Sequence, residues 1–192
     1  MSFKHFFPLT IMALLATVCI GCGGTRGMVP AIAVSQPTAG KALVNFHRPS
    51  NWGGGYTFQI FNDKGVLLGN VKGKSRVQAM CEPGENIFIG NGSNVSVIKA
   101  HLLADKVYDV VCDVGMGMWK ASIAIHPLSK IDARRSHLAE WEANEKSLTV
   151  IRDAHTLKME KKVQPEIPVI LADFLNGDKK DRVMVLNSDD CR

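Results

Sequence analysis

Short apolar runs separated by turn residues are the feature of this sequence that most constrains its fold. Between residues 41 and 128 such runs recur at intervals of roughly ten residues, a spacing typical of two-sheet β proteins. Tyr56, Phe58 and Ile60 alternate with polar side chains, as a strand with one buried face requires. Asn62-Asp-Lys-Gly65 then matches a tight hairpin turn. We therefore predict a mainly β protein with an antiparallel β-sandwich over residues 41–128.

The other predicted strands have the same short, β-branched character and are bounded by similar turns. They cover residues 42–47, 66–68, 77–81, 86–89, 94–99, 107–114 and 119–125. In the strand over 107–114, Tyr108 and Cys112 share one face, whereas Asp109 and Asp113 lie on the other. The two carboxylates predict that this second face is the wetter one.

Beyond Pro127 the apolar spacing changes to that of helices. Four apolar residues recur at spacings of seven, three and seven, as on one helix face: Ile131, Leu138, Trp141 and Leu148. The β-branched run 147–151 interrupts this pattern, and further helices are predicted from Asp153 and over 168–175, followed by a short strand over 183–186. We predict a mostly helical C-terminal extension over residues 129–192 that packs on the sandwich or on a partner.

The first residues have the pattern of an export signal. Lys4 precedes an apolar run from Phe6 to Ile20, which is shorter than the roughly 18 to 20 residues of a spanning helix. The run ends in Val18-Cys-Ile-Gly-Cys22, which resembles a bacterial lipobox. We predict a signal peptide over 1–21 and an acylated Cys22, with palmitate-type chains inserted in the membrane. An ordinary cut after Gly24 or near Gly27 is the alternative.

The lipobox resemblance also implies a location. In lipoproteins of this kind a residue other than Asp after the acylated cysteine directs sorting to the outer membrane, and Gly23 follows Cys22 here. The expected place is therefore the outer membrane, facing the periplasm. Residues 22–40 are rich in Gly, Pro, Ser and Thr and are expected to form the lipid anchor and a flexible tether.

Charge and composition limit the partners. The chain is 46% apolar and 21% charged, as folded globular proteins are. Residues 22–129 hold ten Lys and Arg against six Asp and Glu, but the cations are spread out. Together with export, this argues against a nucleic-acid partner and leaves contact with anionic membrane surfaces open.

The cysteines allow one disulfide. Cys81 and Cys112 both fall in predicted strands, so they could be bridged if those strands are neighbours, and Cys191 would then be unpaired. The alternative is that both are small buried thiols. None of the cysteines has the spacing of a zinc site.

No catalytic, cofactor or metal motif is present in the sequence. His137 and Glu140 are one helical turn apart but have no third ligand in range, and the other histidines stand alone. Gly53-Gly-Gly55 lacks the Lys-Ser/Thr that follows a phosphate-binding loop. We therefore expect no enzyme activity and no cofactor; an exported hydrolase with a triad assembled in space stays open. Trp52, in its polar glycine-rich loop, is the candidate for an exposed contact, whereas Trp119 is expected in the core.

Three short motifs resemble a known family. They are Ala42-Leu-Val-x-Phe-x-Arg-Pro49, Glu82-Pro-Gly-Glu85 and Lys106-Val-Tyr108, and together they resemble the DUF2846 group of bacterial lipoproteins and, more loosely, PEGA-type surface domains. The resemblance covers roughly residues 41–128. It implies an Ig-like or transthyretin-like β-sandwich, an envelope location and no assigned enzyme activity, and it transfers no site residues.

These observations favour a lipid-anchored bacterial envelope protein with a non-enzymatic binding or structural role, in contact with other envelope proteins. The alternative is a module that binds a small ligand or a cell-wall glycan through Trp52.

Overall fold

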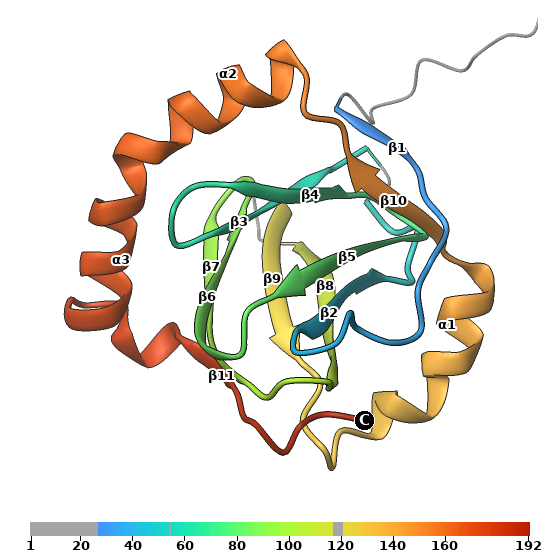
Figure 1. The fold of residues 1–192 in the computed structure, drawn as a ribbon. Helices are drawn as coiled ribbons and strands as arrows, with labels where there is room; N and C mark the ends of the chain where they lie inside the picture. The colour runs from blue at the N-terminus through green and yellow to red at the C-terminus, as the bar shows by residue number, and fades with distance from the viewer. Residues whose placement is uncertain (1–26, 54, 117–120) are drawn as a thin grey trace, which may run out of the picture.

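The computed structural model describes residues 27–53, 55–116 and 121–192 and has an α/β fold with two mixed sheets (Figure 1). Sheet A has the strand order β1 (Met28–Pro30), β10 (Lys146–Val150), β5 (Ser75–Cys81), β2 (Ala42–Arg48), β8 (Val107–Met116) and β9 (Ala121–Pro127). Sheet B has the order β11 (Met184–Leu186), β7 (Val95–Leu102), β6 (Gly84–Asn91), β3 (Phe58–Asn62) and β4 (Leu67–Val71). The predicted signal peptide, Cys22 and Trp119 lie outside the described residues.

The sheets are mixed, so the prediction of a purely antiparallel sandwich was wrong. Chain neighbours such as β3 and β4, β6 and β7, and β8 and β9 do pair antiparallel. However, β2 lies parallel to β8, β10 to β5 and β11 to β7. A parallel pair needs a long crossover between its two strands, and the five strands between β2 and β8 supply one. Turn residues identify hairpins but carry no signal for such distant partners.

The main core lies between the two sheets. Phe46 of β2 and Phe88 of β6 are fully enclosed there, and their rings meet edge to face with centroids 5.2 Å apart. Residues at alternate positions of β2, β8, β3 and β7 complete this core, as the period-two patterns predict. Each buried aromatic ring contributes on the order of 2 to 3 kcal/mol by leaving water.

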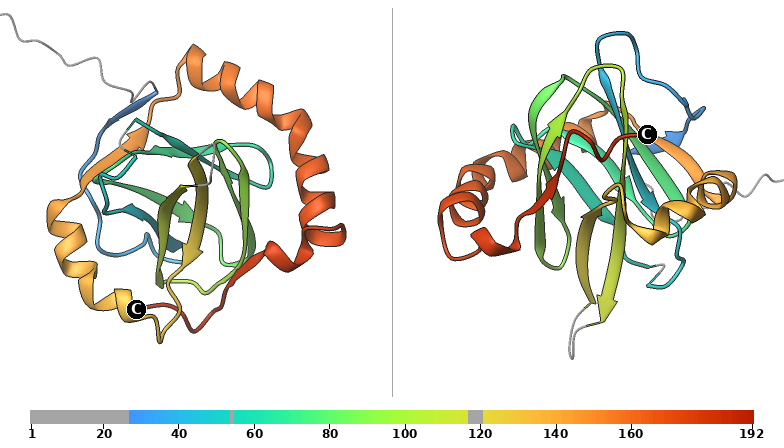
Figure 2. Two further views of the ribbon diagram at one scale, coloured as in Figure 1. Left: turned by 180° about the vertical axis from the view of Figure 1, so that it is seen from behind. Right: turned by 90° about the horizontal axis from the view of Figure 1, so that it is seen from below.

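Helices cover the outer face of each sheet (Figure 2). On sheet A lie the 3-10 turn η1 (Ala133–His137) and α1 (Leu138–Asn144), with Leu138 and Trp141 against Val111. On sheet B lies a continuous helical run of 23 residues formed by α2 (Ala154–Val163), η2 (Gln164–Glu166) and α3 (Ile167–Asn176). The short turn η3 (Lys180–Arg182) leads from it to β11.

Local chemistry explains where the long helical run begins and ends. The carboxylate of Asp153 accepts a hydrogen bond from the backbone N–H of Thr156 at 2.8 Å, a standard N-cap. Pro165 and Pro168 interrupt the regular hydrogen bonding, so the short turn η2 joins α2 to α3. The run ends at Gly177.

The fold extends beyond the predicted sandwich, residues 41–128, at both ends. Residues 28–30, inside the predicted tether, form β1 and pair with β10. The predicted extension contributes β10 to sheet A and β11 to sheet B, so it is part of the two sheets as well as of their cover. None of the helices in the described ranges is long and apolar enough to cross a membrane.

Candidate functional site

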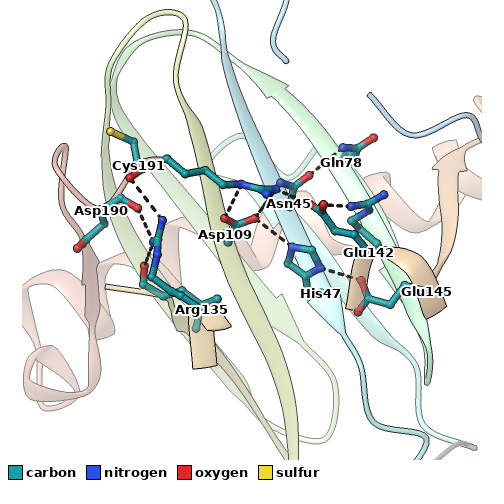
Figure 3. Close-up of polar contacts among 12 residues, drawn as sticks. Asn45, His47, Gln78, Asp109, Arg135, Glu142, Glu145, Asp190 and Cys191 are labelled. Atoms are coloured by element: carbon teal, nitrogen blue, oxygen red, sulfur yellow. Dashed lines mark hydrogen bonds and ion pairs between the residues drawn. The ribbon is translucent and has the colours of Figure 1, made fainter. Parts of the chain in front are cut away.

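A buried group of charged side chains is the densest polar feature of the described structure (Figure 3). We call it the ionic cluster; its members are His47, Arg76, Asp109, Glu142, Glu145 and Arg192. The imidazole of His47 lies at its centre, with Nε2 3.0 Å from Asp109 Oδ1 and Nδ1 2.7 Å from Glu145 Oε2. The side chains of His47 and Asp109 are completely buried.

Sheet register brings the central members together. Asn45 and His47 point to the outer face of β2, because Val44 and Phe46 face the core. Asn45 pairs directly with Asp109 on parallel β8, and its side-chain amide donates a hydrogen bond to Asp109 Oδ1 at 2.9 Å. The helix α1 covers this face and adds the two glutamates.

Two guanidinium groups complete the cluster. Arg192 Nε lies 3.0 Å from Asp109 Oδ2, and the same guanidinium donates a hydrogen bond to Glu142. Arg76 NH1 lies 3.1 Å from Glu142 Oε1. Three carboxylates therefore face two guanidinium groups, and the cluster is electrically neutral when His47 is protonated.

The pKa directions agree with this charge balance. Burial alone lowers the pKa of His47, but hydrogen bonds to Asp109 and Glu145 outweigh it and raise the pKa above its ordinary value. Burial opposes ionisation of Asp109 as well, yet the hydrogen bond from His47 and the charge of Arg192 lower its pKa. Both ring nitrogens of His47 face carboxylate oxygens, an arrangement that favours the imidazolium, since that form can donate from both.

The ionic cluster has the residue types of a metal or catalytic site, but its ligand atoms are already engaged within the protein. Ligand atoms of His47, Asp109 and Glu142 lie within 4.8 Å of one another. Those atoms already contact protein donors, so a metal ion would have to displace Arg192 and deprotonate His47. The imidazole itself is completely buried, and both of its nitrogens are already engaged by carboxylates. The cluster is instead suited to attaching α1 and Arg192 to sheet A.

Trp52 is exposed, as predicted, and a buried arginine organises its loop. The Trp52 side chain is 53% exposed, and Tyr56 in the same loop is 48% exposed. Arg48 at the end of β2 is fully buried and donates to the backbone carbonyls of Trp52 at 3.1 Å, Gly53 at 2.9 Å and Tyr56. Its guanidinium carbon also lies 4.7 Å from the ring centroid of Phe58. The backbone at Trp52, Gly53 and Tyr56 is therefore held from inside, while the two aromatic side chains face solvent.

The other residues singled out by the sequence stay apart. Cys81 and Cys112 are free and buried, so the candidate disulfide is absent and the alternative of two buried thiols holds. Cys81 pairs with Ala42 at one end of β2, whereas Cys112 lies beyond the opposite end, about 20 Å away along the strand direction and far outside disulfide range. His137 and Glu140 form an exposed pair 3.5 Å apart.

Sequence reasoning missed the ionic cluster, because it interpreted Asp109 as a mark of the wetter face. The alternation of Asn45 and His47 with apolar residues in β2 was the available signal. No protein-family model and no curated protein matches the sequence.

Proposed function

We propose that this chain is a lipid-anchored protein of the bacterial envelope with a non-enzymatic binding or structural role. The observation that carries the proposal is how soon the fold begins after the lipobox-like sequence. Met28 is already buried, only six residues after Cys22. Six extended residues span about 20 Å at most, so lipid on Cys22 would hold sheet A close to the bilayer surface. The resemblance to DUF2846 lipoproteins points the same way.

The three motifs that resemble the family lie close together in the fold, which supports a structural origin for the resemblance. The start of β2, the turn after β5 and the start of β8 meet at one end of sheet A, where Leu43 pairs with Val107 and Ala42 with Cys81. Lys41, directly before the first motif, forms an ion pair there with Glu82 of the second. We propose on this basis an Ig-like or transthyretin-like sandwich, modified by the parallel strands. Gly23, which follows Cys22, supports a place at the outer membrane facing the periplasm.

The intact mass and membrane partitioning of the chain expressed in a Gram-negative host test the anchor. We expect a mature chain that begins at Cys22, carries acyl chains and partitions with membranes. Cys22→Ala should abolish acylation and cleavage at this site, whereas Cys19→Ala, three residues earlier, should leave both intact. An unmodified soluble product cut at another position would contradict the proposal.

A second candidate function, binding of a small ligand or cell-wall glycan, is favoured by the Arg48-organised loop. An exposed indole held on a fixed backbone offers a flat apolar face to a sugar ring at little entropic cost. Adding soluble cell-wall fragments should change the tryptophan fluorescence of the chain and of Trp141→Phe, but not of Trp52→Ala. The same response in Trp52→Ala, or none in any of the three proteins, would remove this candidate.

A further inference from the structure

A pocket lies between α2 and the outer face of sheet B. Its volume is about 690 Å³. We call it the cationic groove, and its lining residues are Thr57, Gln59, Asn70, His155, Lys158, Met159 and Lys162. The strands β3 and β4 supply its polar floor, and one face of α2 supplies its basic wall.

The charge of this groove has one sign. His155, Lys158 and Lys162 are three, four and seven residues apart, so they project from the same face of the helix. The lining contains no carboxylate. Within the described ranges neither Lys158 nor Lys162 has an ion-pair partner. The floor adds the hydroxyl of Thr57 and the carboxamide of Gln59, whose nitrogen contacts the sulfur of Met159 and has a second N–H to donate.

Within α2, no carboxylate compensates the charges of Lys158 and Lys162. Lys158 and Lys162 are one turn apart, and like charges at that spacing destabilise a helix. The only carboxylate in α2, Glu160, is used elsewhere: it accepts a hydrogen bond from the backbone N–H of Leu67 at 2.7 Å and pairs with Arg152. A bound anion would offset the repulsion that the helix leaves uncompensated.

The groove lies at the end of the fold from which the anchor would leave. Gly27 packs directly against α2, since a side chain at this position would meet the Thr156 hydroxyl at 2.8 Å. The carbonyl of Gly27 also accepts a hydrogen bond from the backbone N–H of Ile151 at 2.8 Å. Cys22 is five residues earlier, a reach of about 18 Å in extended chain. The first turn of α2 is therefore within reach of the headgroups of a bilayer that holds Cys22.

We propose that the cationic groove binds the phosphate of an anionic membrane-lipid headgroup, an inference that rests on the lipid anchor of the proposed function. The two ammonium groups contact the phosphate oxygens, and Thr57 and Gln59 offer hydrogen bonds to the headgroup hydroxyls. A zwitterionic headgroup brings a cation of its own to the basic wall and binds less well. The protein would thereby take a fixed orientation on the membrane instead of rotating about its anchor.

Calorimetric titration of the full chain in a non-ionic detergent at low salt tests this proposal. The probes are dihexanoyl phosphatidylglycerol, dihexanoyl phosphatidylcholine and inorganic phosphate. The test variant is Lys158→Gln with Lys162→Gln. The control is Lys64→Gln with Lys161→Gln, which removes the same charge from an exposed turn and from the part of α2 outside the groove.

We expect the phosphatidylglycerol probe to bind and the phosphatidylcholine probe to bind at least about tenfold more weakly, because only the first is a net anion. The test variant should lose about tenfold in affinity for phosphatidylglycerol, and the control less than about twofold. Equal losses in the two variants would overturn the groove as the site. Binding of inorganic phosphate without phosphatidylglycerol would overturn the lipid as its ligand.

The proposals of a lipid anchor and of a headgroup site in the groove can be tested independently. Cys22→Ala, titrated in the same detergent, should bind the phosphatidylglycerol probe as the native chain does, because the groove is built from residues 57–162 alone. If Cys22 proves not to be acylated, this titration still decides whether the groove takes an anionic headgroup. Loss of binding in Cys22→Ala would overturn the assignment of the site to α2 and sheet B.

Discussion

Two isosteric substitutions in the ionic cluster should differ widely in cost, although each removes one carboxylate that faces Arg192. Asp109→Asn acts on a side chain that is fully buried, and Glu142→Gln on one that is 31% exposed. Neither changes the packed volume, so no cavity is formed. The comparison isolates the effect of burial on a charge.

Asp109→Asn disrupts several contacts at once. Oδ1 now accepts hydrogen bonds from His47, Asn45 and Arg192, and an amide oxygen can keep part of that set. The new amide N–H₂ takes the place of the other oxygen and faces Arg192 Nε, a second donor, across 3.0 Å. The cluster also gains one uncompensated positive charge. Breaking a buried ion pair in this way costs about 3 to 5 kcal/mol of unfolding free energy.

Glu142→Gln should cost about 1 kcal/mol or less, because solvent screens an ion pair at a partly exposed position. Urea unfolding followed by tryptophan fluorescence measures both values, and Trp141 reports directly because its ring centroid lies 6.0 Å from that of His47. With an m-value of about 2 kcal/mol per molar, the urea midpoint falls by about 1.5 to 2.5 M for Asp109→Asn and by about 0.5 M or less for Glu142→Gln.

High salt should further distinguish the stability losses of Asp109→Asn and Glu142→Gln. In 1 M NaCl the loss from Glu142→Gln should shrink toward zero, while that from Asp109→Asn persists because ions do not reach the buried pair. Equal midpoint shifts for the two variants, or a shift of Asp109→Asn that disappears in salt, would refute the account of the cluster as buried and internally neutralised.

Three further predictions follow from the same structure. The raised pKa of His47 gives stability that is fully present below its ordinary value of about 6.5 and is lost as pH rises through the folded-state value. The urea midpoint of the native chain relative to His47→Gln should therefore fall as pH rises above about 6.5. Gly65→Ala should lower the free energy of unfolding by about 2 to 3 kcal/mol, since φ is +71° and the new Cβ would lie 2.8 Å from a side-chain carbon in η2. Gly40→Ala, at φ +77° in open space, should lower it by about 1 kcal/mol. Thermal or urea unfolding measures both values. Cys191, which is only partly buried, should react with iodoacetamide before the two core thiols, because burial raises the pKa of Cys81 to about 12. Peptide mass spectrometry of the native protein gives the order in which the three thiols are alkylated.

Signals that are local in the chain predicted their elements well. The turn at 62–65 joins β3 to β4, and Asp153 caps α2, one residue before the helix begins. The β-branched residues 147–151 were interpreted as an interruption between helices and are almost entirely β10. Each of these features depends on dihedral preferences and hydrogen bonds within a few residues, which a sequence shows directly.

Features that depend on what covers a strand were not predicted. The period of two places Asp109 on the outer face of β8, but it does not say that α1 and Arg192 close over that face. A carboxylate that would be exposed on an open sheet is here buried among cations, so the inference of a wet face was wrong for Asp109. It holds for Asp113, which is 46% exposed on the same strand. The parallel partners of β2 and β5 escaped notice for the same reason, since pairing across many residues leaves no local pattern.

The C-terminal third of the chain also determines how rigid the cationic groove is. The helical run over 154–176 is preceded by β10, which lies between β1 and β5 in sheet A, and followed by β11, which pairs with β7 in sheet B. The strands on either side of the run are thus hydrogen-bonded into the sheets, and Val163, Ile167 and Phe174 pack its second half onto sheet B. These attachments hold the helical run against the strands below it. Its basic face is therefore held over Thr57 and Gln59 before any ligand arrives, and binding an anion there requires little ordering of the backbone.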